Sequence, residues 1–214
     1  MQALRSRSRA FFLVPIVAAL ALGATHLLAA EPRDADPLVV RQDKALLHDA
    51  RSPTLGDPKG DVTLIEFFDY ACPTCRATEP RIDALLRSDP RVRIIAKEYP
   101  MLSPQSLIAA RAALAAARQD HYAAYHQALL NYRGPLTEAV IFGVAREMKL
   151  DLTQLRRDMA SPAIAAEIQA NLALGRAIRA PGTPTLVAGG RILKQSSTDI
   201  DFSRLVASLR VHRS

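Results

Sequence analysis

The sequence predicts an α/β domain in which a strand–helix–strand unit is followed by a block of helices, then by two short strands and a last helix. Three observations support this prediction. The segment "DVTLIEFF" (residues 61–68) is a run of β-branched, aromatic and aliphatic residues, which is typical of a buried strand. Residues 104–179 are rich in alanine and contain no strand pattern. The segment "TLVAGGRIL" (residues 185–193) places two glycines between two apolar runs, as in a β-hairpin.

Composition bounds the class of protein. The chain has 214 residues, of which 49% are hydrophobic and 23% are charged, and these values indicate one ordinary globular domain. The formal net charge is +7, but acidic and basic residues are interspersed and no long basic block occurs. A nucleic-acid-binding protein would need a concentrated basic face, so we expect no nucleic-acid partner.

Residues 1–30 have the pattern of an export signal. Arg5, Arg7 and Arg9 form a basic start, the apolar segment from Phe11 to Ala30 follows, and no acidic residue occurs before Glu31. This pattern predicts a signal peptide; the alternative is a retained N-terminal membrane anchor, because a mainly apolar segment of 20 residues is just long enough to span a bilayer. Either interpretation places the remainder in the periplasm or cell envelope, with anchoring to the inner membrane by residues 11–30 in the second case.

Residues 31–55 form a lead-in segment before the domain, which we place at residues 56–214. A short helix is predicted from Leu38 to Ala50. This helix can either pack on the domain or mediate self-association, so the lead-in is a candidate surface for a homo-oligomer.

The elements of the domain follow in order. A helix opens at the "CPTC" sequence and runs to about Arg87, with Pro80 inside it, and "RVRIIAKEYP" (residues 91–100) predicts a second strand parallel to the first. The helical insertion covers residues 104–179, with helices at Pro104–Tyr132, Leu136–Lys149, Asp151–Ala160 and Pro162–Arg179. The hairpin strands at 185–188 and 191–193 lead to a last helix from Ile200 to Val211, which is amphipathic.

The chain has two cysteines, Cys72 and Cys75, at the junction between the first strand and its helix. With Cys72 at the N-cap and Pro73 at the first helical position, backbone amides and the helix dipole would stabilise a thiolate at Cys72. A lowered pKa would make Cys72 the more exposed, attacking thiol, and Cys75 the resolving thiol. In an exported protein such a close pair favours redox chemistry, since the short loop that it closes gives little structural stabilisation.

Two metal-site interpretations compete with the redox one. A structural zinc site needs two further ligands, and none of the histidines stands at a spacing that pairs with "CPTC". Two thiolates alone could hold a soft ion such as Cu(I), so a copper-binding or copper-assembly protein is the alternative from another functional class.

The combined motifs resemble a known family. "CPTC" opening a helix after "LIEFFDY", a helical insertion, and then "GTPT" (residues 182–185) before a hairpin and a terminal helix are similar to the DsbA-like branch of the thioredoxin superfamily. The resemblance covers about residues 55–212. It implies a thioredoxin fold with a helical insertion and a thiol-disulfide oxidoreductase without a cofactor.

The same resemblance implies roles for individual residues. Cys72 matches the attacking cysteine and Cys75 the resolving one; Pro184 matches a cis-proline beside the disulfide, and Thr183 contributes backbone pairing to the substrate. Glu66 matches a buried acid beneath the cysteines, and Lys97 matches its basic partner.

The expected activity is oxidation of protein thiols through a Cys72–Cys75 disulfide. Its substrates would be reduced or misoxidised exported proteins, and a membrane redox partner would regenerate the disulfide. Isomerase or reductase activity with the same residues is the first alternative. Thr74 stands where the best-known oxidising members carry histidine between the cysteines, so a strongly oxidising potential does not follow from the motif.

Overall fold

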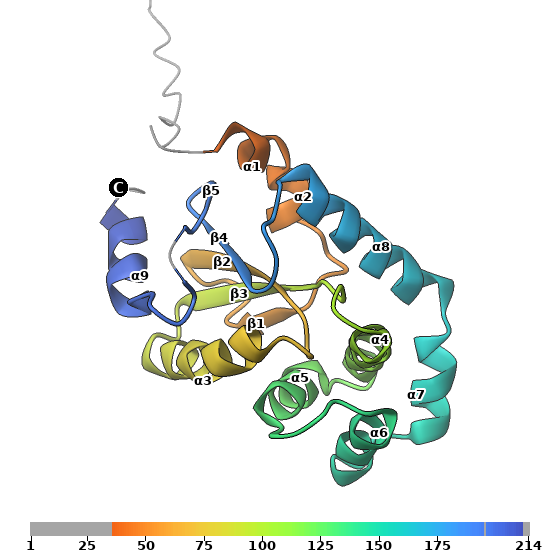
Figure 1. Ribbon diagram of the computed structural model, residues 1–214. Coiled ribbons are helices and arrows are strands. Elements are labelled where there is room, and N and C mark those ends of the chain that lie inside the picture. The colour runs from red at the N-terminus through yellow and green to blue at the C-terminus, as the bar shows by residue number, and fades with distance from the viewer. Residues whose placement is uncertain (1–35, 195, 212–214) are drawn as a thin grey trace, which may run out of the picture. The chain divides into compact units, whose positions relative to one another are not determined.

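The computed structural model describes residues 36–194 and 196–211 (Figure 1). The predicted signal peptide or anchor at residues 1–30 lies outside these residues. Within the described ranges, no helix is both long enough and apolar enough to cross a membrane.

A mixed sheet forms the centre of the described residues, with its five strands in the order β1-β3-β2-β4-β5. The strands are β1 (Thr54–Gly56), β2 (Val62–Phe68), β3 (Val92–Glu98), β4 (Thr185–Ala188) and β5 (Arg191–Ile192). The parallel pairing of β2 with β3 confirms the predicted strand–helix–strand unit, and β4 and β5 form the predicted antiparallel hairpin. Gly189 and Gly190 both have positive φ, which glycine adopts without steric cost.

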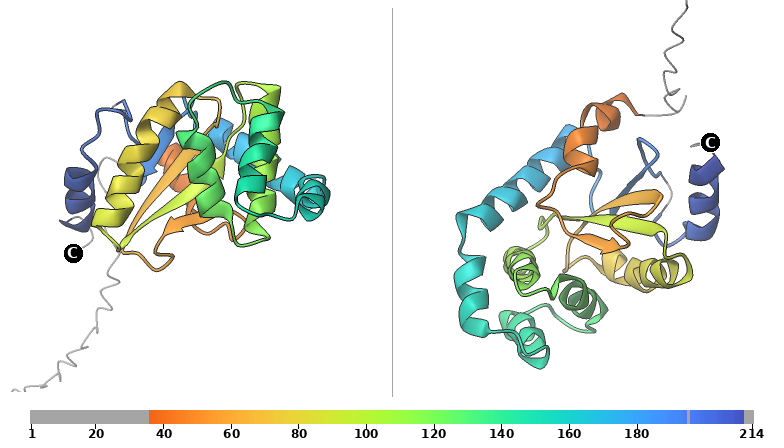
Figure 2. Two further views of the ribbon diagram at one scale, coloured as in Figure 1. Left: turned by 90° about the horizontal axis from the view of Figure 1, so that it is seen from below. Right: turned by 180° about the vertical axis from the view of Figure 1, so that it is seen from behind.

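Helices cover both faces of this sheet (Figures 1 and 2). They are α1 (Pro37–Arg41), α2 (Asp43–Leu47), α3 (Pro73–Ser88), α4 (Pro104–Ala117), α5 (Tyr122–Asn131), α6 (Glu138–Glu147), α7 (Leu152–Met159), α8 (Pro162–Ala177) and α9 (Phe202–Val211). Asp151 and Ser161 cap α7 and α8 through their side chains, as their sequence positions predict.

The core has two parts, one on each face of the sheet. Side chains alternate between faces along a strand, so Leu64 and Phe68 of β2 pack with α3, α4 and α5, whereas Ile65 and Phe67 pack with α1, α2 and α8. The first face carries the larger cluster, and it is the face on which the cysteine-bearing helix α3 lies. Alternate residues of β2 and β3 point to opposite faces of the sheet, so only every second side chain can reach the cysteines.

Three expectations about secondary structure need correction. The predicted helix Pro104–Tyr132 is two helices, because the chain turns after Ala117 and Asp120 has a φ of 59°. The lead-in helix is also two short helices, α1 and α2. Strand β1 was not predicted; it pairs antiparallel with β3 and extends the sheet. The expected start of the domain at residue 56 therefore falls within this strand.

Candidate functional site

Cys72 lies at the N-cap of α3, at the end of the loop that follows β2. Its backbone is extended, Pro73 occupies the first turn, and the Cys75 backbone N–H donates to the Cys72 Sγ over 3.3 Å. The Cys72 Sγ also donates to the Thr183 carbonyl oxygen over 3.2 Å. The sulfur is thus held between a helix N-terminus and the segment before β4, although these two parts are 111 residues apart in the sequence.

This environment stabilises the thiolate of Cys72. Its pKa falls from 9.0 to about 6, mainly because of the hydrogen bond with the Cys75 thiol, with further help from the Thr183 side chain and from the amides of Cys75 and Thr74; burial opposes the shift. Donors that point at a sulfur favour its charged form. The expected role of Cys72 as the acidic thiol therefore has a structural basis.

Cys75 has the opposite environment. Burial raises its pKa, and its hydrogen bond with the Cys72 sulfur and the nearby Glu66 carboxyl raise it further. Both cysteines are free thiols, and both are largely covered: 4% of Cys72 and 1% of Cys75 is exposed. Cys72 is the more exposed of the two, as expected, but only slightly, and its sulfur is in contact with the Thr183 carbonyl oxygen.

The "GTPT" segment forms the second wall of the site. The Thr183–Pro184 peptide bond is cis, and the Thr185 Oγ1 donates to the Gly182 carbonyl oxygen over 2.6 Å. A groove of about 420 Å³ lies beside this segment. It is lined by Thr74, Pro181, Thr183, Pro184, Thr185, Ile192, Leu193, Lys194, Ser196 and Ser197.

Glu66 lies on the cysteine side of the sheet, as expected. It is 2% exposed, and burial raises its pKa well above the ordinary value, with additional contributions from the charges of Glu79 and Cys72. A carboxyl with a raised pKa holds its proton more firmly than an ordinary carboxyl and can donate it to a strongly basic thiolate. Glu66 is therefore suitably placed to exchange a proton with Cys75.

The expected pairing of Glu66 with Lys97 is wrong, because the two side chains lie on opposite faces of the sheet. Glu66 is in register with Ala96, whereas Lys97 is in register with Phe67. The Lys97 ammonium instead donates to the Ala45 carbonyl oxygen over 3.0 Å and to the Ser52 Oγ over 2.8 Å, and lies 3.6 Å from Asp49. Burial lowers its pKa. Lys97 thus holds the lead-in segment against the sheet.

We expect Lys97→Ala to lower the free energy of unfolding by about 3 kcal/mol, because it leaves buried polar partners unpaired. Urea unfolding followed by circular dichroism measures this loss. Lys44→Ala is the matched control, since Lys44 is exposed on α2 and its removal should change stability by no more than about 0.5 kcal/mol. Equal effects of the two variants would contradict the structural role of Lys97.

Asp69 organises the loop that carries the cysteines, a role that the sequence did not predict. Its carboxylate is 1% exposed. One oxygen accepts from the Ala71 amide over 2.8 Å, and the other accepts from the amides of Met101 and Leu102 over 2.8 and 2.9 Å. Met101 and Leu102 are 50% and 51% exposed, which is unusual for large apolar side chains. Asp69 therefore fixes an exposed apolar pair relative to the cysteine loop.

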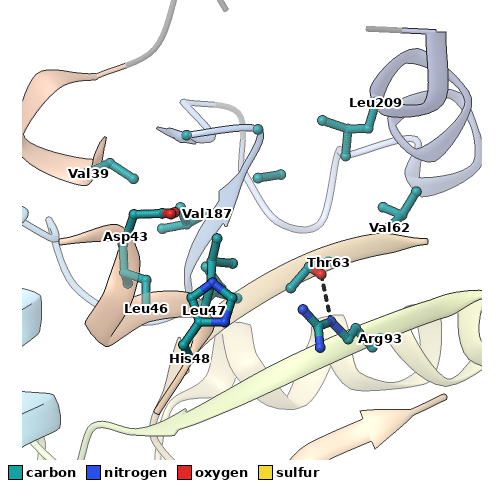
Figure 3. Close-up of a pocket in the computed structure, with 14 residues that line it drawn as sticks. Val39, Asp43, Leu46, Leu47, His48, Val62, Thr63, Arg93, Val187 and Leu209 are labelled. Carbon is teal, nitrogen blue, oxygen red and sulfur yellow. Dashed lines mark hydrogen bonds between the residues drawn. The ribbon is translucent and has the colours of Figure 1, made fainter. Parts of the chain in front are cut away.

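A separate cavity of about 340 Å³ lies around Thr63 and Arg93, which belong to the sheet face that does not carry the cysteines (Figure 3). Its walls come from the lead-in helices, the sheet, the hairpin and α9, and it includes Val39, Leu46, Val187 and Leu209. The Arg93 Nε donates to the Thr63 Oγ1 over 2.7 Å at one side. None of the predicted site residues lines this cavity.

No metal centre is formed by grouped ligands in the described parts of the chain: no three or more His, Cys, Asp or Glu side chains converge there. The chemistry available at the site is that of two thiols with different acidities, a buried carboxyl and an adjacent groove. This arrangement can perform nucleophilic exchange between a thiolate and a disulfide.

Comparison with known proteins supports this chemistry. Along 185 residues the chain is 27% identical to the thiol:disulfide interchange protein DsbA of Bordetella pertussis, covering 83% of this chain and 84% of that protein. The crystal structure of a thioredoxin-like oxidoreductase from Silicibacter pomeroyi superposes with a TM-score of 0.74 at 39% identity, covering 79% of this chain and 96% of that one.

A second kind of relative is a much longer protein, of which only a part matches this chain. The chain is 31% identical over 143 residues to the Na(+)/H(+) antiporter NhaA 1 of Salinispora arenicola; the match covers 66% of this chain but spans only 22% of the antiporter. A family model described as thioredoxin matches residues 48–208, which is most of the chain. The chain therefore belongs to the thioredoxin family, in which it is similar to the DsbA-like thiol-disulfide oxidoreductases.

Proposed function

We propose that this protein is an exported thiol-disulfide oxidoreductase that oxidises cysteine pairs of other exported proteins. The observation that carries the proposal is the position of the Cys72 sulfur at the N-terminus of α3, 3.3 Å from the Cys75 amide nitrogen and 3.2 Å from the Thr183 carbonyl oxygen. A sulfur in this position leaves readily from a disulfide, because its thiolate is stabilised.

The reaction proceeds in two exchanges. A substrate thiolate attacks the Cys72 sulfur of the Cys72–Cys75 disulfide, and Cys75 leaves as a thiolate that takes up a proton from Glu66. A second substrate thiolate then attacks the substrate sulfur of the mixed disulfide and releases Cys72 as a thiolate. Two electrons pass from the substrate to the enzyme, and a membrane oxidase partner removes them. The groove beside Thr183 and Pro184 accommodates the substrate backbone.

The redox potential of the Cys72–Cys75 couple tests the direction of electron flow. Equilibration of the protein with glutathione buffers, followed by trapping of free thiols, measures this potential. A potential well above the cytosolic glutathione poise supports oxidation of substrates. A potential near that poise contradicts it and favours a reductase. Catalysed refolding of a reduced, disulfide-containing protein provides the corresponding activity assay.

Isomerase activity depends on the oligomeric state. We propose that the lead-in segment, residues 31–55, carries the contact surface if the protein self-associates. Because Lys97 and β3 hold this segment in the fold, exposed side chains of α2, Asp43 and Lys44, are replaced and the segment is kept. Light scattering of the exported protein measures its mass. A monomer supports oxidation, whereas a dimer or higher oligomer that dissociates in the Asp43→Ala/Lys44→Ala variant supports isomerisation.

Thr74 should limit the oxidising strength of the couple. Its side chain is exposed between the cysteines and carries no charge. We expect Thr74→His to lower the pKa of Cys72 by about one unit and to raise the potential by about 30 mV, since a nearby cation stabilises the thiolate. Thr74→Asn is the uncharged control and should leave both quantities nearly unchanged. Equal shifts in the two variants would show that charge is not the cause.

A further inference from the structure

A buried polar network lies beside the cysteine helix and is not used by the exchange steps above. It consists of Tyr70, Glu79, Glu98, Tyr122 and His126, all of which are at most 7% exposed. These residues come from the cysteine loop, α3, β3 and α5, and α5 packs directly against α3 (Figures 1 and 2). Their convergence in a closed interior needs an explanation, because burying polar groups costs free energy.

Hydrogen bonds fix the proton positions at one end of this network. The Glu98 Oε1 accepts from the Tyr70 hydroxyl over 2.9 Å and from the Tyr122 hydroxyl over 3.0 Å. The Tyr70 oxygen also lies 3.1 Å from the His126 Nδ1. Because the Tyr70 proton is directed to Glu98, the Tyr70 oxygen must accept from a protonated Nδ1. The Nε2 of His126 is therefore the ring nitrogen that is left to pair with another group.

The Nε2 of His126 faces the carboxyl of Glu79. The distance from Nε2 to the Glu79 Oε2 is 3.7 Å. Both atoms are fully buried, and neither has a hydrogen-bond partner among the described residues. A buried donor and acceptor left unpaired at this separation need only a small closing movement to exchange a proton.

Glu79 connects the network to the cysteines. It follows Cys75 by four residues on α3, and both side chains are buried, so they lie on the same face of the helix. Glu66 projects from β2 into the same region: its pKa responds to Glu79 and Cys72, and the pKa of Cys75 responds to Glu66. Cys75, Glu66, Glu79 and His126 therefore lie in one buried region in which the charge of each group affects its neighbours.

The charges around this region are mostly acidic. The carboxyls of Glu66, Glu79 and Glu98 belong to it, and Asp69 and Glu167 of α8 act on Glu98 from outside it. The basic groups near it include the His126 imidazole and Arg76, whose guanidinium donates to the carbonyl oxygens of Tyr70 and Gly134. Several buried carboxyls near one another cannot all be ionised, so the region retains protons.

We propose that Glu79 and His126 form a proton store that serves Cys75, an inference that rests on the proposed thiol-disulfide exchange. When the Cys72–Cys75 bond is broken by a substrate thiolate, the electron pair stays on Cys75, which takes a proton from Glu66; Glu66 is reprotonated by Glu79, and Glu79 by the His126 Nε2. When the disulfide forms again, Cys75 returns the proton along the same series. The proton thus moves within the protein interior during each cycle.

Infrared difference spectroscopy of the wild-type protein tests this proposal without a variant. We expect reduction of the disulfide by a small dithiol to remove the band of a protonated carboxyl group or that of an imidazolium. The variants Glu66→Gln, Glu79→Gln and His126→Gln assign each band to a residue. A difference spectrum without any change at Glu79 or His126 would contradict the proposal that they store the proton.

Kinetics provide the second test. In His126→Gln, the rate of disulfide reduction should fall more steeply with rising pH than in wild type, by about tenfold at most, and the solvent deuterium isotope effect should increase, because the interior proton is no longer held. His121→Gln is the matched control at the start of α5, outside the network, and should keep the wild-type profile. Parallel pH profiles in wild type and His126→Gln would contradict the proposal.

These tests separate the store from the proposed function. Both use the isolated Cys72–Cys75 couple and a small dithiol, so they report on the proton path even if the protein does not oxidise other proteins. A failed refolding assay with a positive infrared result would reject only the proposed substrate class. Tyr70→Phe, which keeps the ring but removes the link to His126, provides a further variant if His126→Gln does not fold.

Discussion

Replacing Cys72 with serine will abolish thiol oxidation completely, because a serine hydroxyl at the N-terminus of α3 forms no disulfide and is not ionised near neutral pH. Refolding of a reduced substrate protein, followed by the loss of its free thiols, measures the effect. The variant should fold normally, since serine can also accept the amide hydrogen bond of an N-cap residue.

Replacing Cys75 with alanine should have a different outcome. The mixed disulfide at Cys72 then lacks its resolving thiol, so covalent complexes with substrate proteins will accumulate and appear on non-reducing gels. The double variant Cys72→Ser/Cys75→Ala is the control and should trap nothing. If Cys75→Ala traps no partner in the compartment to which the protein is exported, thiol exchange through Cys72 is refuted.

The acidity of Cys72 predicts a pH-dependent reactivity of the reduced protein. With a pKa of about 6, Cys72 is about nine-tenths thiolate at pH 7, whereas an ordinary cysteine thiol is mostly protonated there. Alkylation by iodoacetamide should therefore follow a titration curve centred near pH 6. A midpoint near the ordinary value would remove the basis of the proposed mechanism.

The same pKa predicts how the stability of the reduced protein depends on pH. Between the folded pKa of about 6 and the unfolded value near 9.0, the unfolded chain binds more protons than the folded one, so stability rises with pH. The gain is at most about 4 kcal/mol at 1.36 kcal/mol per pKa unit, and it is lost as pH falls to 6. Urea unfolding at several pH values measures it.

The oxidised protein is the internal control for this measurement. It has no Cys72 thiolate, so the gain should be missing. Glu167, whose pKa is raised to about 7 by burial, titrates nearby and makes stability fall with pH, but it does so in both redox forms. The reduced-minus-oxidised difference therefore removes the contribution of Glu167 and keeps that of Cys72. A difference that is constant from pH 6 to 9 would contradict the assigned thiolate.

Local patterns were sufficient to predict the cysteine site. The strand before Cys72, Pro73 at the first helical turn and the "GTPT" turn before the hairpin each specify their own geometry through backbone preferences. The order of these motifs along the chain indicated the family and placed Thr183 and Pro184 beside the cysteines. The resemblance to the family also implied that Glu66 is a buried acid, and its side chain is 2% exposed in the structure.

The predictions that failed depend on contacts between segments that are distant in the sequence. The Glu66–Lys97 pairing was wrong because the register of β2 and β3, which decides their faces, is not encoded in either strand by itself. The sequence did not predict a role for His126, because its neighbour Glu79 lies on another helix. The turn between α4 and α5 was missed because alanine favours helix throughout that segment, whereas packing places Asp120 in a left-handed conformation.

The carboxylate of Asp69 joins two loops that carry different kinds of side chain. One loop presents a reactive sulfur, and the other presents Met101 and Leu102 to solvent. Because a single buried group anchors both, neither loop can shift without breaking hydrogen bonds of the other. A molecule that docks on the two apolar side chains therefore meets a preformed surface and loses little of its affinity to ordering the protein.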